Sequence, residues 1–286
     1  MEVRLADCAG FCFGVKRAVD TVYEQLKNGK TIYTYGPIVH NEEVVRELSE
    51  KGVRVLENKE ELKHLKAGEN IPTVIIRAHG VAKEIYDIME ANGLECIDAT
   101  CPFVKKIHRI VELKSNEGYH VIVVGDPKHP EVEGIVGWCP GPVTVLETPE
   151  QAENFVKTEG EKLCIVSQTT YNYNKFQYIV EIFEKKGYND SVVNTICNAT
   201  EERQRSAKTI AADADVMIVI GGKHSSNSRK LYEICQRECE HTYFIQTLDD
   251  LHLDLPKAVR LVGITAGAST PNKLIEEVQN NVRINF

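Results

Sequence analysis

The sequence predicts an α/β fold of three similar small units, each with a parallel sheet, arranged with pseudo-threefold symmetry around a central site. Cys12, Cys101 and Cys197 divide the 286-residue chain into three segments of similar pattern. Within each segment, short apolar runs alternate with helix-like stretches, which is typical of parallel sheets covered by helices on both faces. A single large doubly wound sheet is the competing interpretation, and the threefold repetition of order disfavours it.

The repeat also predicts where the units begin and end. Residues 1–100 form the first unit, which includes the N-terminal cysteine segment, residues 101–196 the second, and residues 197–286 the third. Length alone allows two domains or three small ones. The boundaries therefore depend on the repeat.

Each segment is expected to begin with an amphipathic helix just after its cysteine, because apolar residues recur there at helical spacing. These residues are Val15, Val19, Val22 and Leu26, then Val104, Ile107 and Val111, and more weakly Ala207, Ile210 and Ala211. Three strands follow in each segment, at 31–35, 53–56 and 74–76, at 121–124, 143–146 and 163–166, and at 216–220, 243–245 and 261–264. Acidic helix starts precede the last strand of each segment, at 59–61, 149–151 and 248–250.

Polar loops recur at matching distances from the three cysteines. The residues 28 positions on, and then 67 or 68 positions on, are His40 and His79, His129 and Thr169, and Ser225 and Thr265. Ligands of open parallel sheets bind beyond the carboxyl ends of the strands. We therefore expect these loops to lie on the ligand-binding side of their own units.

Composition excludes several classes of protein. The chain has 42% apolar and 27% charged residues, as ordinary soluble globular proteins do. Its net charge of −8 argues against a general nucleic-acid binder, because phosphate backbones are bound by basic faces. No apolar run approaches the ~20 residues of a membrane helix, and the N-terminus lacks a signal-peptide layout. We expect a cytoplasmic protein without membrane or nucleic-acid partners.

The nine cysteines favour reduced thiols and metal ligation over disulfides, because no signal peptide is recognised and the count is odd. A helix start stabilises a thiolate, and Cys101 lies between a capping Thr100 and Pro102. Three converging thiolates suit an iron–sulfur cluster with one iron left open. Structural zinc and buried structural thiols are the alternatives, although zinc usually uses C-x2-C pairs that are missing here. The other six cysteines are interpreted as core fillers.

The loops are rich in hydroxyls, imidazoles and small residues, which present donors to a phosphate. No P-loop or dinucleotide fingerprint is present, so ATP and NAD are not indicated. His40, His79 and His129 follow strands at equivalent positions, and an imidazole can be protonated on binding a diphosphate. Glu131 is a carboxylate among donors, which suggests a proton carrier of raised pKa, with Thr169 relaying the proton.

Seven motifs in order, spread over essentially the whole chain, resemble those of the LytB or IspH family, the 4-hydroxy-3-methylbut-2-enyl diphosphate reductases. They are Gly10-Phe-Cys12, Asp98-Ala-Thr-Cys-Pro102, His129-Pro-Glu-Val-Glu-Gly134, Gln168-Thr-Thr170, Thr195-Ile-Cys197, Ser225-Ser-Asn227 and Thr265-Ala-Gly-Ala-Ser269. The family fold implies three α/β units around a central iron–sulfur cluster.

The resemblance implies a role for each matching residue. The metal ligands would be Cys12, Cys101 and Cys197, the diphosphate would be bound by His40, His79, Ser225, Ser226, Asn227 and Ser269, and His129, Glu131 and Thr169 would lie near the reacting hydroxyl. The cofactor would be a [4Fe–4S] cluster, which becomes [3Fe–4S] when the open iron is lost.

The implied activity is reductive dehydroxylation to isopentenyl and dimethylallyl diphosphate, the last step of the methylerythritol phosphate route. Electrons would come from ferredoxin or flavodoxin, and the protein would be a monomer. Two other classes stay open: an iron–sulfur hydro-lyase acting on a phosphorylated small molecule, and a zinc-stapled phosphate-binding protein.

Overall fold

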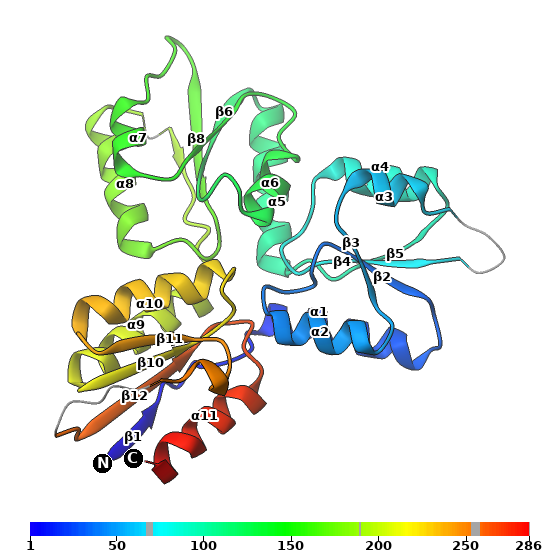
Figure 1. Ribbon diagram of the computed structural model, residues 1–286. Coiled ribbons are helices and arrows are strands. Elements are labelled where there is room, and N and C mark those ends of the chain that lie inside the picture. Colours follow the sequence, from blue (N-terminus) through cyan, green and yellow to red (C-terminus); the bar gives the residue numbers. More distant parts are fainter. Residues whose placement is uncertain (67–70, 189, 253–257, 286) are drawn as a thin grey trace. The chain divides into compact units, whose positions relative to one another are not determined.

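The computed structural model describes residues 1–66, 71–188, 190–252 and 258–285, and it contains three four-stranded sheets (Figure 1). Every pair of neighbouring strands in them is parallel. This confirms the predicted α/β fold class and excludes a single large sheet. The chain divides into two compact units, one of residues 1–16, 39–47 and 198–286 and the other of residues 17–38 and 48–197.

The first sheet has the order β3-β2-β4-β5. Its strands are β2 (Ile32–Tyr35), β3 (Arg54–Leu56), β4 (Thr73–Ile76) and β5 (Glu95–Asp98), and the helices of this part of the chain are α1 (Phe13–Lys27), α2 (Glu42–Glu50), α3 (Lys59–His64) and α4 (Lys83–Ala91). Val74 and Ile76 of β4 pack with Leu62 of α3 and with Ile85 and Met89 of α4. These two helices therefore cover one face of the sheet.

The second sheet has the order β7-β6-β8-β9. Its strands are β6 (Tyr119–Val124), β7 (Val143–Leu146), β8 (Lys162–Ser167) and β9 (Ser191–Val192), and its helices are α5 (Pro102–Asn116), α6 (Pro130–Val136), α7 (Pro149–Asn154) and α8 (Tyr173–Lys185). Ile122 packs in a cluster with α7 and α8, whereas Val123 packs in a cluster with α5 and α6. Helices thus cover both faces, which explains why β6 reads as a continuous apolar run.

The third sheet has the order β11-β10-β12-β1. Its strands are β10 (Val216–Ile220), β11 (Thr242–Ile245), β12 (Leu261–Ala266) and β1 (Glu2–Leu5), with α9 (Asn198–Asp213), α10 (Ser226–Glu238), the 3₁₀ turn η1 (Leu248–Asp250) and α11 (Asn272–Asn285). Ile218 packs on α11, and its neighbour Met217 packs on α9 and α10. Figure 1 shows the corresponding layers, with α11 on one side of the strands and α9 and α10 on the other.

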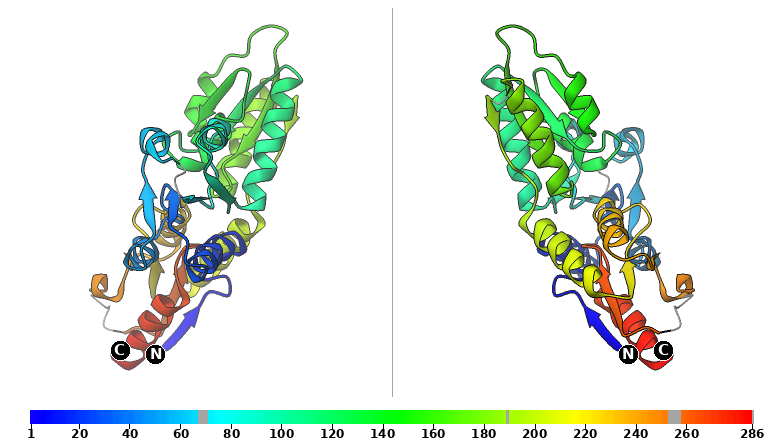
Figure 2. Two further views of the ribbon diagram at one scale, coloured as in Figure 1. Left: turned by 90° about the vertical axis from the view of Figure 1, so that its right-hand side faces the viewer. Right: turned by 90° about the vertical axis from the view of Figure 1, so that its left-hand side faces the viewer.

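The N-terminal strand completes the sheet of the C-terminal segment. β1 pairs with β12 from Glu2 beside Leu261 to Leu5 beside Ile264, and the two termini lie close together in Figures 1 and 2. The division predicted at 1–100, 101–196 and 197–286 placed β1 with the first sheet, and for these residues it was wrong. The rest of that division into domains stays a prediction.

The three sheets share one topology, in which two central strands have an edge strand on either side. The edge strands β5, β9 and β1 are those the sequence failed to predict. They carry polar residues such as Glu95, Ser191 and Glu2, and none matches the apolar run of a central strand. The nine predicted strands are all present, with bounds that differ by at most two residues at either end.

A glycine follows the central strand β2, β6 or β10 in every sheet. The N–H groups of Gly36, Gly125 and Gly221 donate to Leu56, Leu146 and Ile245 at 2.8, 2.9 and 2.8 Å. A Cβ at Gly221 would lie 2.1 Å from Ser228 Oγ, and one at Gly36 would lie 2.2 Å from Arg77 Nη1. Glycine at these positions therefore lets a polar side chain approach the strand end.

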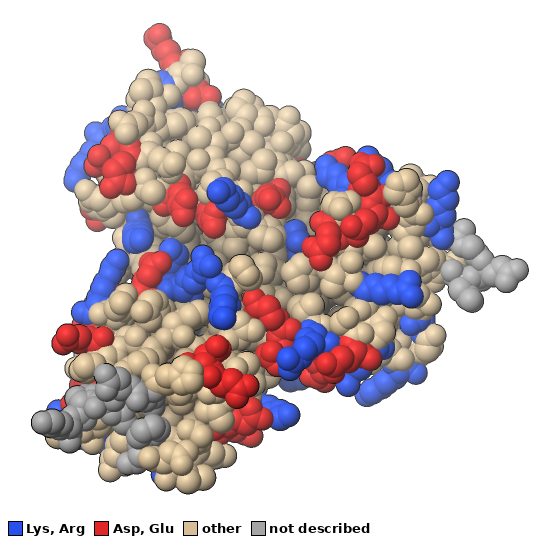
Figure 3. Space-filling model, in the orientation of Figure 1, with Lys and Arg blue, Asp and Glu red and all other residues tan. Residues whose placement is uncertain are grey.

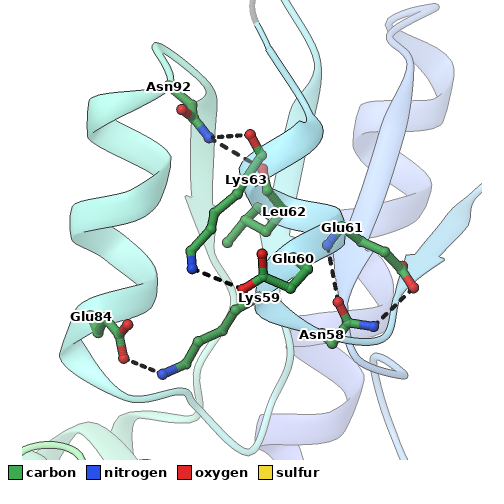
Figure 4. Close-up of polar contacts among 8 residues, drawn as sticks. All are labelled: Asn58, Lys59, Glu60, Glu61, Leu62, Lys63, Glu84 and Asn92. Atoms are coloured by element: carbon green, nitrogen blue, oxygen red, sulfur yellow. Dashed lines mark hydrogen bonds and ion pairs between the residues drawn. The ribbon is translucent and has the colours of Figure 1, made fainter.

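Helix α3 is short, has acidic residues in its first turn and is stabilised by polar contacts. Asn58 Oδ1 accepts the N–H of Glu61 at 3.0 Å, as a helix cap does, and Lys59 forms an ion pair with Glu84 of α4 (Figure 4). Asn92 Nδ2 donates to the carbonyls of Leu62 and Lys63, both at 3.3 Å. These contacts join α3 to both the start and the end of α4.

Charged residues of both signs are interspersed over the face drawn in Figure 3. Many form exposed ion pairs, such as Lys83 with Glu112 at 2.7 Å and Arg260 with Asp215 at 3.1 Å. Solvent screening makes such pairs weak contributors to stability. Among the described residues, no helix has the length and apolar character needed to cross a membrane.

Candidate active site

Each of the three predicted cysteine ligands directly precedes a helix. Cys12 precedes α1, Cys101 is the N-cap of α5, and Cys197 precedes α9; all three are partly exposed. The partial positive charge and unpaired N–H groups of a helix start stabilise a thiolate. The three thiols therefore have the same local setting, as the sequence repeat predicted.

One backbone hydrogen bond is repeated at all three cysteines. The N–H of Cys12 donates to Ala268 at 3.2 Å, that of Cys101 to Ala78 at 2.9 Å, and that of Cys197 to Thr169 at 3.1 Å. In every case the acceptor is the second residue after a central strand, namely β12, β4 or β8. The backbone of each cysteine is thus bonded to the loop that follows the carboxyl end of a central strand.

The other cysteines have different settings. Burial raises the pKa of the thiols of Cys139 and Cys235 to about 12, and burial also raises the pKa of Cys164 and of Cys239. Cys164, Cys235 and Cys239 are buried core residues, as predicted. Cys96 is exposed on β5, so its interpretation as a core filler was wrong.

Glu131 lies in the first turn of α6 with both carboxylate oxygens bonded to one residue. Its Oε1 accepts the N–H of Thr169 at 2.6 Å, and its Oε2 accepts the Thr169 hydroxyl at 2.7 Å. The side chain is 1% exposed, and this burial raises the pKa of Glu131 to about 7, although the two hydrogen bonds from Thr169 lower it. A carboxyl that titrates near neutrality is suited to transferring a proton.

Thr169 connects this carboxylate to one of the thiol loops. Its N–H and hydroxyl bind Glu131, and its carbonyl accepts the N–H of Cys197. Thr169 itself is 7% exposed and lies in the turn after β8. The Glu131 carboxylate and the Cys197 segment are therefore positioned by one residue.

His129 is held by the same helix start as Glu131. Its Nδ1 accepts the N–H of Glu131 at 3.1 Å, which leaves Nε2 to carry the hydrogen of the neutral ring. Its ring is T-shaped to that of His79, with centroids 5.5 Å apart. The imidazole of His129 thus lies beside a second imidazole.

His79 lies in a tight turn after β4. The turn ends at Gly80, whose φ of +73° suits glycine, and a Cβ there would lie 2.7 Å from His108 Cε1. Arg77 supports the same turn, because its Nε donates to the carbonyl of Gly80 at 3.3 Å while its guanidinium lies against Gly36. Arg77 was not among the predicted site residues, although a basic residue directly after a buried strand was a signal for it.

The remaining loops belong to the unit that contains the third sheet. Ser225 caps α10 by accepting the N–H of Ser228 at 3.3 Å, and Ser226 is the first residue of that helix. Asn227 is 4% exposed, and neither Oδ1 nor Nδ2 of its amide has a hydrogen-bond partner among the residues described. A buried amide of this kind indicates a ligand, because an unsatisfied polar group is costly.

His40 and Ser269 lie together in this unit. The hydroxyl of Ser269 donates to the carbonyl of His40 at 2.9 Å, and a Cβ at Gly222 would lie 2.6 Å from the same carbonyl oxygen. Thr265, predicted in the loop, lies instead inside β12 and is fully buried. The loop begins two residues later, so the residue count from Cys197 placed it too early.

The predicted site residues thus form two groups, one in each compact unit. The first contains Cys12, His40, Ser225, Ser226, Asn227 and Ser269, and the second contains His79, Cys101, His129, Glu131, Thr169 and Cys197. Within each group, the described hydrogen bonds join residues that are far apart in the sequence. The first group offers one thiol at a helix start and the second offers two, and each group also has donors that suit an anionic ligand.

Comparisons with known proteins agree with these features. The model of the LytB protein family matches residues 3–283. The 4-hydroxy-3-methylbut-2-enyl diphosphate reductase of Caldanaerobacter subterraneus subsp. tengcongensis is 47% identical over 285 residues, which are 99% of this chain and 97% of the relative. That of Clostridioides difficile is 44% identical over 97% of this chain and 98% of the relative.

Two solved structures are similar along nearly the whole chain. The E-1-hydroxy-2-methyl-but-2-enyl-4-diphosphate reductase from Plasmodium falciparum has a TM-score of 0.90 at 32% identity, and covers 97% of this chain and 86% of its own. An (E)-4-hydroxy-3-methyl-but-2-enyl diphosphate reductase, described as the terminal enzyme of the non-mevalonate pathway, has a TM-score of 0.69 at 43% identity and covers 99% of both chains. From sheet topology, repeated cysteine settings and these matches, the chain belongs to the LytB protein family.

Proposed function

We propose that this chain is an oxidoreductase that converts 4-hydroxy-3-methylbut-2-enyl diphosphate to isopentenyl and dimethylallyl diphosphate, the terminal step of the non-mevalonate pathway. The relatives named above support the reaction and the substrate. The observation that carries the chemistry is the fully buried Glu131, bound at both oxygens by Thr169, whose carbonyl holds the Cys197 segment. These contacts support a role for Glu131 as a proton source near Cys197, one of the proposed metal ligands.

Cys12, Cys101 and Cys197 are the proposed ligands of a [4Fe–4S] cluster. Their fit is supported by three equivalent settings at helix starts, whereas burial raises the pKa of Cys139, Cys164, Cys235 and Cys239. Such a cluster, when bound by three thiolates, supplies single electrons and an open Lewis-acidic iron. The long spacing between the cysteines also disfavours a zinc staple.

Hydroxyl, amide and imidazole groups are the proposed donors to the diphosphate. Ser225, Ser226 and Asn227 lie at the start of the 13-residue helix α10, where N–H groups and the helix dipole attract an anion. The unsatisfied amide of Asn227 supplies a further donor. His40, His79 and Ser269 complete the proposed set.

Glu131 supplies the proton that leaves with the substrate hydroxyl. Two electrons and two protons are consumed: one proton and the hydroxyl leave as water when the allylic C–O bond breaks, and the other proton adds to either of two carbons. The raised pKa keeps a large share of Glu131 protonated near neutral pH. The Thr169 hydroxyl, which contacts Oε2, relays the proton. His129, whose Nδ1 accepts the N–H of Glu131, lies near the reacting hydroxyl.

Three further assignments belong to this proposal. The electron donor is a ferredoxin or a flavodoxin, because the reaction takes electrons singly. The protein acts as a monomer. It works in the cytoplasm, where the reduced state of thiols is maintained.

Elemental analysis and turnover of anaerobically purified protein test the proposal together. We expect iron and acid-labile sulfide, and formation of both products from the substrate in the presence of a reduced viologen dye. Zinc without iron would overturn it in favour of a zinc-stapled phosphate-binding protein. Iron-dependent turnover that proceeds equally without any reductant would instead indicate a hydro-lyase.

A further inference from the structure

Arg17 forms hydrogen bonds with the backbone of the residues directly before Cys101. Its Nη1 donates to the carbonyls of Ala99 and Thr100 at 3.2 and 3.0 Å, and its Nη2 donates to that of Asp98 at 3.2 Å. Three consecutive carbonyls are therefore bound by one guanidinium, whose planar fork suits such an arrangement. Among the described residues, Arg17 has no carboxylate partner for its charge.

Arg203 plays the corresponding part in front of Cys12. Its Nη1 donates to the carbonyls of Gly10 and Ala266 at 3.0 and 2.9 Å, and its side chain is 4% exposed. Gly10 has a φ of +94°, and a Cβ there would lie 2.8 Å from Asn272 Oδ1. The segment before Cys12 is thus closely packed against the end of β12, and a buried guanidinium joins the two.

Both arginines follow a different cysteine from the one whose loop they hold. Arg17 stands in α1, five residues after Cys12, and Arg203 stands in α9, six residues after Cys197. The equivalent position after Cys101 is the exposed Lys106. An arginine therefore holds the backbone at two of the three cysteines, Cys101 and Cys12. Lys106 faces solvent and does not hold the third loop in this way.

We propose that Arg17 and Arg203 are positioning residues of the metal site, which fix Cys101 and Cys12 and set the reduction potential of the bound cluster. The inference rests on the proposed function, because it concerns the cluster that these thiols would bind. A positive charge close to the thiolates favours the state that has gained an electron. Hydrogen-bonded groups behind metal ligands also govern how firmly the metal is held.

Substitutions separate the hydrogen bonds from the charge. Gln at either position removes the charge and keeps at most some of the hydrogen bonds to the carbonyls. Lys keeps the charge but lacks the planar guanidinium group. Arg205 provides a matched control, because it lies on α9 two residues from Arg203 but is exposed to solvent. R205Q removes an equal charge without touching a thiol loop.

The first measurement uses metal-free protein, so that it does not depend on the cluster. Backbone hydrogen exchange should quicken at Cys101 and its preceding residues in R17Q, and at Cys12 in R203Q, with each variant affecting its own loop. R205Q should leave both loops unchanged. Exchange in both loops that matches wild type in R17Q and R203Q would overturn the positioning role.

The second measurement uses the cluster-bound protein. In an EPR-monitored redox titration, R17Q and R203Q should lower the reduction potential, and R17K and R203K should restore it toward the wild-type value. Chelator-driven iron loss should be about 10- to 100-fold faster in the Gln variants. A potential and an iron-loss rate equal to those of R205Q would refute the inference, whereas wild-type protein without iron would refute the proposed function and leave the exchange result to judge the two loops.

Discussion

The hydroxyl of Thr169 should set the pH at which the enzyme loses activity. This hydroxyl donates to Glu131 Oε2 at 2.7 Å and so stabilises the ionised carboxylate. Hydrogen bonds to charged groups contribute about 1.5–3 kcal/mol. Because one pKa unit corresponds to about 1.4 kcal/mol, T169V should raise the pKa of Glu131 by about 1–2 units, from about 7 to about 8–9.

The sign of the effect on activity follows from the role of Glu131 as an acid. The protonated form is active, so kcat falls as the pH rises through the pKa of Glu131. T169V should move this alkaline limb upward while lowering the maximum rate, because the relay hydroxyl is also lost. This shift can be checked by measuring steady-state kcat with a chemical reductant. A range from about pH 6 to about pH 10 covers the pKa of about 7 and the raised value expected in T169V.

Two variants control the experiment. T170V removes a neighbouring hydroxyl, which accepts from Gln168 rather than binding Glu131, and it should leave the limb in place. E131Q should abolish most turnover. An alkaline limb at the wild-type position in T169V would show that Glu131 is not the titrating acid.

Three further outcomes are expected. C197S should lose bound iron, measured by elemental analysis, whereas C235S should keep it, because Cys235 is a residue of α10 that is buried against α9. N227A should raise KM about tenfold or more with a smaller change in kcat, because the lost amide binds the unreacting diphosphate. The free energy of unfolding of metal-free protein should fall by up to about 3 kcal/mol as the pH rises from about 4.5 to about 7, because folded Glu131 holds its proton in that window and the unfolded chain does not. E131Q should remove this slope in denaturant titrations, and an unchanged slope would contradict the raised pKa.

The central strands could be predicted from sequence because burial on both faces leaves a continuous apolar run. Residues 216–220 were placed with both bounds right. The edge strands β5, β9 and β1 could not be predicted in this way, since strands as short as Ser191–Val192 carry no periodicity. β1 also pairs with residues some 259 positions away, a relation that local pattern cannot express.

The candidate site could be predicted where the type of residue itself indicates the chemistry. A carboxylate among donors predicted the raised pKa of Glu131, and the repeat identified three thiols with one local setting. The backbone contacts were not predictable, because the carbonyls of Ala78 and Ala268 belong to residues with no functional side chain. Arg17 and Arg203 were missed for a related reason: their partners are carbonyls, which every residue has.

The pairing of β1 with β12 has a consequence for how the protein is made. Residues 2–5 leave the ribosome long before the strand they join, Leu261–Ala266, which lies some 259 residues further along the chain. The sheets of β2–β5 and β6–β9 are encoded entirely by residues that emerge earlier, so they can form during translation. β1 therefore cannot pair until β12 has been synthesised, and closure of this long loop is expected to be the slow, late event in the folding of the third sheet.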